Sequence, residues 1–191
     1  MNKIFLTILL IFLFSLSGKA QKNSSLRLHM QGYNLVFPGV EIAYQYPIIN
    51  HIISEEKQNK FVVQLSPVVD FYVQKNNHTG IGLMGELSLQ YQSSQRINFE
   101  IYGGFGILAG ILAGEIYEQN AQGDFEKSNF KGNIYQSWKA GLGISKSVLS
   151  KKGRMLSYHL RLGARYAKTP GAITVSNVSF GIIYTLSKKE N

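Results

Sequence analysis

The stretch LSYHLRLGARY, residues 156–166, decides the fold class of this chain. Apolar or aromatic side chains stand at every even position from Leu156 to Tyr166, and polar or small ones, among them His159 and Arg161, stand between them. A period of two is typical of a β-strand with one apolar and one polar face. The pattern does not decide whether the apolar face points into the molecule or out of it. An apolar face that points inward forms the core of a soluble barrel or sandwich, whereas one that points outward faces lipid.

The same alternation recurs along the chain, separated by gaps rich in Gly, Asn, Pro and Ser, as hairpins require. No helical periodicity competes with it after the N-terminal segment. The predicted strands are 26–32, 39–46, 60–73, 80–91, 98–109, 134–147, 156–166 and 175–186. The sequence therefore predicts an all-β fold of eight antiparallel strands in up-and-down order. The longest predicted loop is 110–133, the turn at 47–59 is also long, and Pro67 inside a strand predicts a β-bulge.

The N-terminus, MNKIFLTILLIFLFSLSGKAQ, has the three parts of a secretory signal peptide. Lys3 supplies the basic region, residues 4–14 the apolar region, and Gly18 to Ala20 a cleavage site of small residues. We therefore expect residues 1–20 to be removed and residues 21–191 to form one domain; an uncleaved anchor helix is the alternative. The sequence holds no Cys, so disulfides do not stabilise the exported domain.

Two properties of the faces indicate that the polar one lies inside. The apolar face carries bulky Tyr, Phe, Trp and Leu side chains, which the narrow interior of an eight-stranded barrel does not hold. The polar face is rich in Gly and Ser, and its acidic and basic residues balance, as a closed lumen requires because an unpaired buried ion costs several kcal/mol. The predicted lumen charge network is Arg27, Glu41, Asp70, Glu86, Glu100, Lys139, His159, Arg161 and Arg165.

Aromatic residues near the predicted strand ends are typical of the two membrane interfaces of a transmembrane β-barrel. The predicted lipid-interface aromatics are Tyr44, Tyr46, Phe71, Tyr91, Tyr117, Tyr166 and Tyr184. The alternative is a soluble periplasmic lipid-binding barrel with the apolar face inside, because period two alone does not distinguish inside from outside.

Three segments carry a resemblance to a known class of protein: Phe37-Pro38-Gly39, YGGFGILAG at 102–110 and the closing VSFGIIYTL at 178–186. With them the chain resembles the small eight-stranded outer-membrane barrels of the OmpX or OmpA N-domain kind, and most of all the uncharacterised outer-membrane β-barrels of the Bacteroidota. The resemblance implies a Gram-negative outer membrane, periplasmic termini, contact with lipopolysaccharide and insertion by the barrel-assembly machinery. The closing strand departs from the assembly signal, because it ends in Leu186 and SKKEN and not in a terminal aromatic residue.

Some barrels of this size modify lipid A, and the deacylases among them carry a His-x-Ser-Asn run near the last hairpin. Here Ser176-Asn177 is present without that His. We interpret His159 as a member of the charge network and His78 as a polar turn residue. The four His and the absence of Cys give no metal-ligand spacing, so neither metal, cofactor nor catalytic residue is expected.

The expected function is therefore structural, in the cell envelope, or an interaction of the surface loops, with an extracellular ligand at 110–133. A narrow channel and a lipid A-modifying enzyme are the alternatives. The formal net charge of +9 does not indicate nucleic acid as a partner, because an exported barrel without stacking platforms lacks the means to bind it.

Overall fold

The computed structural model describes residues 24–34, 37–54, 59–74, 78–112, 117–119, 123–127, 132–149, 154–168 and 173–186. The predicted signal peptide, residues 1–20, lies outside the described residues. Within those residues, no helix is long and apolar enough to span a membrane.

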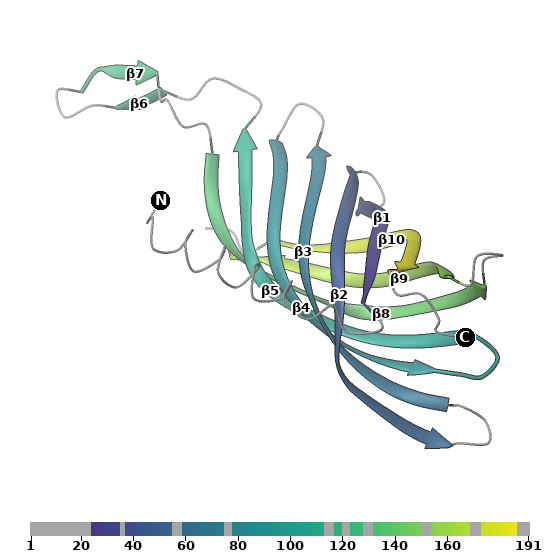
Figure 1. Cartoon of the computed structure of the whole chain (residues 1–191). Coiled ribbons are helices and arrows are strands. Elements are labelled where there is room, and N and C mark those ends of the chain that lie inside the picture. The colour runs from purple at the N-terminus through teal and green to yellow at the C-terminus, as the bar shows by residue number, and fades with distance from the viewer. Residues whose placement is uncertain are drawn as a thin grey trace.

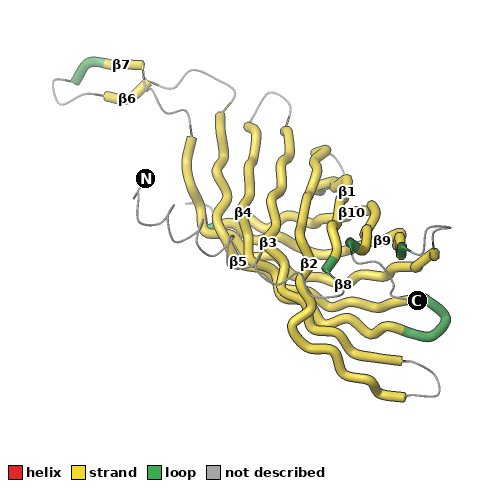
Figure 2. The backbone as a smooth tube through the Cα atoms, viewed as in Figure 1, coloured by secondary structure: helices red, strands yellow, loops and turns green. Residues whose placement is uncertain are grey.

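Eight long strands close into one antiparallel barrel (Figures 1 and 2). Around the barrel the order is β1, β10, β9, β8, β5, β4, β3 and β2. Their bounds are β1 Ser25–Tyr33, β2 Phe37–Ser54, β3 Asn59–Gln74, β4 His78–Gln92, β5 Ile97–Leu112, β8 Gly132–Leu149, β9 Met155–Ala167 and β10 Ile173–Thr185. Each of these strands pairs with its neighbours in the chain, and β1 pairs with β10 to close the ring. The predicted all-β, eight-stranded, up-and-down fold is confirmed.

The predicted loop 110–133 contains a short hairpin, β6 Tyr117–Gln119 paired with β7 Phe125–Lys127. In Figure 1 this hairpin stands beyond the barrel, at the end where β5 finishes and β8 begins. Strands β5 and β8, which flank it, pair with each other as far as Ile111 and Gly132. The ladder therefore extends two residues into the predicted loop on the β5 side and two on the β8 side.

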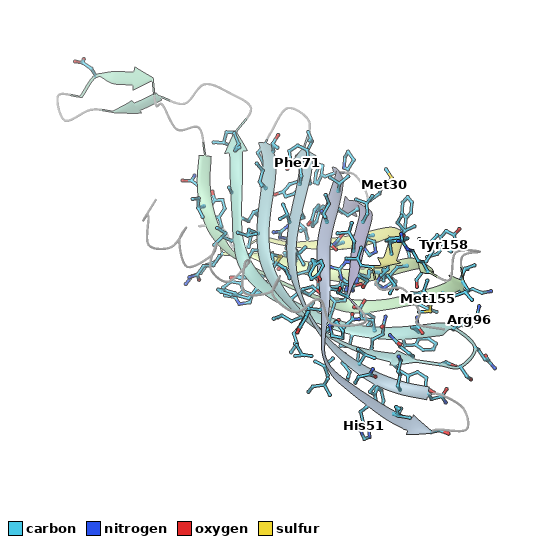
Figure 3. All side chains as sticks on the ribbon, in the orientation of Figure 1. Met30, His51, Phe71, Arg96, Met155 and Tyr158 are labelled. Atoms are coloured by element: carbon cyan, nitrogen blue, oxygen red, sulfur yellow. The ribbon has the colours of Figure 1, made fainter. Side chains whose placement is uncertain are left out.

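Strict alternation along the strands places the apolar face outside. Leu160 and Leu162 are 43% and 56% exposed, whereas Arg161 between them is 0% exposed. Met30, Phe71 and Tyr158, labelled in Figure 3, are likewise exposed residues of the outer surface. This is the reverse of the arrangement that the soluble alternative requires, in which these side chains form the core.

The prediction of a bulge at Pro67 was wrong. The β2–β3 pairing keeps one register from Ala43↔Val68 to Tyr46↔Leu65, and Pro67 pairs in register with Gly85 of β4. Proline removes one N–H donor but adds no residue to the strand, so the ladder loses contacts locally without a change of register.

The long turn predicted at 47–59 was also wrong, because β2 continues as strand to Ser54 and β3 begins at Asn59. The register shifts of this pair lie here, between Pro47 and Ile49 and between Ile52 and Ser54. An extra residue in one strand shifts the later side chains relative to the faces of the sheet. The clean alternation therefore stops after Tyr46, which explains why the pattern did not predict the last part of β2.

Candidate functional site

The nine residues of the predicted lumen charge network all lie inside the barrel. They come from β1, β2, β3, β4, β5, β8 and β9, and each occupies a position whose parity points inward. None of the nine is more than 3% exposed. Since an eight-stranded barrel leaves an interior just wide enough for side chains, these groups reach one another across the lumen.

Arg161 is the centre of the main cluster. Its guanidinium donates to both oxygens of Glu100, from Nε at 2.8 Å and from Nη2 at 2.7 Å. It also donates to both oxygens of Glu86, from Nη1 at 3.0 Å and from Nη2 at 2.8 Å. The aromatic ring of Tyr102 lies 4.0 Å from the guanidinium carbon. Two bidentate carboxylates and one aromatic face hold this guanidinium in a fixed geometry.

Glu41 is the second centre of the same cluster. Arg27 lies 2.9 Å from Glu41 through Nη2 and donates to Glu86 at 2.9 Å through Nη1, so it links the two carboxylates. Lys139 donates to the other oxygen of Glu41. The continuous chain Lys139, Glu41, Arg27, Glu86, Arg161 and Glu100 therefore contains three cations and three anions, which leaves no net charge in this part of the lumen.

Arg165 and Asp70 form a separate pair nearer the C-terminal end of β9. Nη1 of Arg165 donates to Asp70 at 2.6 Å and to the Tyr33 hydroxyl at 2.7 Å. Its Nε donates to Ser137 at 2.8 Å. Sequence reasoning placed all the charges in one network, whereas the structure divides them into a six-residue chain and this pair. Tyr33 was missed as a partner, because the predicted strand 26–32 ended one residue before it, whereas β1 continues to Tyr33.

Replacing Glu100 by Ala is expected to destabilise the barrel strongly. The change removes two of the four charge-assisted bonds of Arg161 and leaves an excess buried cation. Breaking one partner of a buried ion pair costs about 3–5 kcal/mol. Urea unfolding in lipid vesicles, followed by the fluorescence of Trp138, measures the change. Gln95→Ala in the exposed turn before β5 is the control, and an unfolding midpoint of E100A equal to that of the control would contradict the lumen assignment.

Inward glycines make room for the charged side chains. A Cβ at Gly82 would lie 2.5 Å from Nη2 of Arg165 and 2.6 Å from Oδ2 of Asp70. At Gly85 on the same strand, which points outward, a Cβ would have no atom within 4 Å. The spacing of small inward residues is therefore part of the site; sequence reasoning noted a polar face rich in Gly but did not single out Gly82.

We expect Gly82→Ala to cost about 1–3 kcal/mol of unfolding free energy, the usual cost of overpacking. The new methyl group must displace Arg165 or Asp70, which a buried ion pair holds in place. Gly85→Ala on the outer surface is the matched control and should stay within the error of the wild type. The same urea titration measures both; equal midpoints would show that the Arg165–Asp70 pair shifts at no cost.

The two inward histidines lie against each other, with ring centroids 5.0 Å apart. Nε2 of His159 is 3.1 Å from Glu100, so His159 belongs to the main cluster. His29, which is not a member of the predicted lumen charge network, lies 3.3 Å from Ser179 Oγ and 3.8 Å from Glu41, in both cases through Nδ1. A catalytic triad uses the two ring nitrogens separately, one for the nucleophile and the other for the carboxylate. This Ser–His–Glu group therefore lacks triad geometry.

The Ser176-Asn177 pair is not assembled into a site. Ser176 is exposed and donates through its backbone N–H and hydroxyl to Oδ1 of Asn34, whereas Asn177 is 1% exposed inside the barrel. Nε2 of His78, the histidine that the sequence analysis interpreted as a polar turn residue, lies 3.0 Å from the Tyr72 hydroxyl. Among the described residues, no group of three or more His, Cys, Asp or Glu is arranged to hold a metal ion.

The predicted interface aromatics lie on the outer side of the strands where the structure describes them. Phe71 and Tyr166 are 40% and 37% exposed. Half-buried members are Tyr44, Tyr46, Tyr91 and Tyr184. Tyr117 lies in β6, and its side chain is outside what the structure describes.

Trp138 joins Tyr166 and Phe105 in one outer aromatic cluster, with ring centroids 5.4 and 5.3 Å from the Trp ring. Sequence reasoning placed Trp138 and Phe105 on the apolar face but not in this cluster. Their contact follows from the register of β5, β8 and β9, in which Phe105 pairs with Trp138 and Trp138 with Tyr166.

No family model matches this sequence, and no curated protein matches it. Solved structures with a similar arrangement include the outer membrane enzyme PagL, with a TM-score of 0.48 and 9% identity, covering 85% of this chain and 99% of that chain. A de novo designed transmembrane β-barrel has a TM-score of 0.44 and 12% identity, covering 88% and 98% of the two chains. The N-terminal β-barrel domain of Pseudomonas aeruginosa OprF has a TM-score of 0.40 and 12% identity, covering 88% of this chain and 100% of that chain. At these identities and TM-scores, nothing of the neighbours' activities transfers to this chain.

Proposed function

We propose that this chain is an integral outer-membrane β-barrel with a structural or surface-interaction role, and that its lumen is closed by the charge network. The observation that carries the proposal is the buried six-residue chain centred on Arg161, which crosses the lumen with no net charge. A barrel filled in this way can hold its loops at the membrane surface, but it offers no path for solutes through the lumen.

The outer surface supports the membrane part of the proposal. Among the outward positions of the eight barrel strands as described, only Lys146 is charged, and it lies near the C-terminal end of β8. An apolar outer band around a polar interior is the arrangement of transmembrane barrels. In water the same surface would be an exposed apolar area far larger than monomeric soluble proteins show.

In the proposed orientation both termini are periplasmic, and the β6–β7 hairpin faces the outside of the cell. The hairpin is then the element that presents an extracellular interaction site, while the outer band contacts lipid and lipopolysaccharide. Insertion by the barrel-assembly machinery would close the ring through the β1–β10 pairing.

The electrophoretic mobility of unboiled and boiled membrane fractions tests the barrel. We expect the unboiled protein to run faster and to be found in the outer membrane, because a closed ladder resists detergent. A single mobility, with the protein in the soluble periplasmic fraction, would overturn the proposal.

Two further measurements separate the proposed role from the alternatives. Purified protein in planar bilayers should give no stepwise conductance, because the ion pairs fill the lumen; regular single-channel steps would make it a channel. The mass of lipid A should be the same in cells with and without the protein, because the serine and histidine groups described above form no nucleophile–base pair. A change in acylation would make it an enzyme.

A further inference from the structure

The end of the barrel away from Ser25 and Thr185 holds a cavity of about 510 Å³. Its lining side chains come from all eight barrel strands, so the cavity lies on the barrel axis. Small-molecule sites in proteins typically measure about 300–1,000 Å³ and are mostly apolar with a few polar groups. We call this cavity the mouth pocket; it comprises the space bounded below by Arg165 and around it by Tyr33, Phe37, Tyr72, Leu108 and Tyr135.

The inward side chains change character at the mouth pocket. Below it, inward positions hold the charged clusters. At its level, Tyr33, Tyr72, Leu108 and Ala167 form a buried apolar cluster, with Phe37 and Val175 packed against it. Polar side chains return at the ends of the strands, where Asn34, Gln74 and Asn133 also line the pocket. Filling the lumen explains the charged layer, but it does not explain an apolar layer that leaves a cavity.

The floor of the mouth pocket carries no net charge. Arg165 is the charged residue that lines it, and its guanidinium is paired with Asp70 at 2.6 Å and bonded to the Tyr33 hydroxyl at 2.7 Å. An anion placed here would compete with Asp70 for the same cation. The floor therefore suits a neutral ligand better than an anionic one.

The walls are aromatic and held in place. The Tyr33 and Tyr72 rings lie 4.8 Å apart, and the Tyr72 ring lies 5.5 Å from that of His78. Both tyrosine hydroxyls are engaged, that of Tyr33 with Arg165 and that of Tyr72 with Nε2 of His78. Rings fixed in this way favour a planar ring in the ligand, because stacking then costs little side-chain entropy.

We propose that the mouth pocket is a binding site for a small, uncharged, ring-containing molecule that carries a hydrogen-bonding group. The ring lies between Tyr33, Phe37, Tyr72 and Tyr135, and the hydrogen-bonding group faces Asn34, Gln74 or Asn133 at the strand ends. This goes beyond the structural role proposed above and gives the barrel a ligand of defined chemistry.

Nuclear magnetic resonance of the barrel in lipid nanodiscs tests the site with naphthol as a neutral probe and naphthoate as its anionic counterpart. We expect naphthol to shift the backbone amide signals of Tyr72, Leu108 and Ala167 in a saturable way. Shifts that grow linearly and fall on outward residues such as Leu162 would mean partition into lipid, and would overturn the site. Naphthoate binding more than tenfold tighter than naphthol would overturn the neutral ligand.

Gly110 lines the mouth pocket and provides a variant that fills it. A Cβ at Gly110 would lie 3.6 Å from Cε2 of Tyr135 and 3.9 Å from Cδ2 of His78, both ordinary contacts. Gly110→Leu is therefore expected to fold normally and to weaken naphthol binding at least about tenfold, since the side chain occupies the ligand's space. Gly85→Leu places the same side chain on the outer surface, and it should bind naphthol like the wild type.

Unchanged naphthol affinity in G110L would overturn the proposal, as would an equal loss in G85L. Should G110L not fold, Tyr135→Ala replaces it, with the same expected loss from the removal of one wall. The binding test is independent of the membrane proposal, because a soluble protein is titrated in the same way in buffer. The unboiled mobility reports on the barrel in the membrane, and the titration reports on the mouth pocket.

Discussion

Replacing Arg161 by Met is expected to be among the most damaging single changes in the barrel. Met keeps an unbranched apolar stem but has no charge, so Glu86 and Glu100 keep their burial and lose the guanidinium that binds both. Breaking one partner of a buried pair costs about 3–5 kcal/mol. Because two carboxylates lose this guanidinium and only Glu86 keeps a second cation, Arg27, we expect the cost to reach at least the upper end of that range. Urea unfolding in lipid vesicles, followed by Trp138 fluorescence, measures it.

A second variant distinguishes the electrostatic cause from a loss of packing. Adding Glu100→Gln to Arg161→Met restores charge balance in the main cluster. The double variant should then be more stable than the sum of the two single effects by about 0.5–3 kcal/mol, the usual range of coupling between contacting residues. If the effects of the two substitutions on the unfolding free energy simply add, the ion pairs would stabilise the barrel by filling space and not by neutralising charge.

Replacing Leu162 by Arg is expected to destabilise the protein in lipid by about 2–4 kcal/mol, the cost of a cation on the lipid-facing surface near the bilayer midplane. Leu162 lies next to the middle residue of β9 and is 56% exposed on the outer side. The change leaves the lumen untouched, because Leu162 and Arg161 point to opposite faces. Reversible unfolding in vesicles again provides the measurement.

Thr174→Arg is the matched control for Leu162→Arg. Thr174 is also exposed on the outer face, but it lies at the start of β10, near the strand end. At a membrane interface the same cation costs about 0–1 kcal/mol. If the two arginines cost the same, the cost of a cation on the outer surface would not depend on its position along the barrel axis. That result would argue against a membrane around the barrel.

The sequence by itself determined which residues face which side. In a β-strand, the parity of a residue number decides its face, so His159, Arg161 and Arg165 were assigned together to the lumen before any pairing was known. The balance of acidic and basic residues on that face then predicted a closed interior. Both inferences need only the local backbone geometry, which is the same in every strand.

Only the tertiary structure decided which inward side chains meet. Lys139 reaches Glu41 across 98 positions of the chain, and Arg161 reaches Glu86 across 75. Such contacts depend on the register of each strand pair and on the tilt of the strands, and neither is encoded in a period of two. The division of the charges into two clusters therefore had no sequence signal.

The same physical reason explains the remaining differences. The register shifts after Pro47 replaced the predicted bulge at Pro67, because a missing donor and an inserted residue are different defects. The mouth pocket arises because inward residues of all eight strands reach one level of the barrel. Periodicity assigns each of these residues to a face, but only closure of the ring assigns them to a common height, and closure is a property of the assembled sheet.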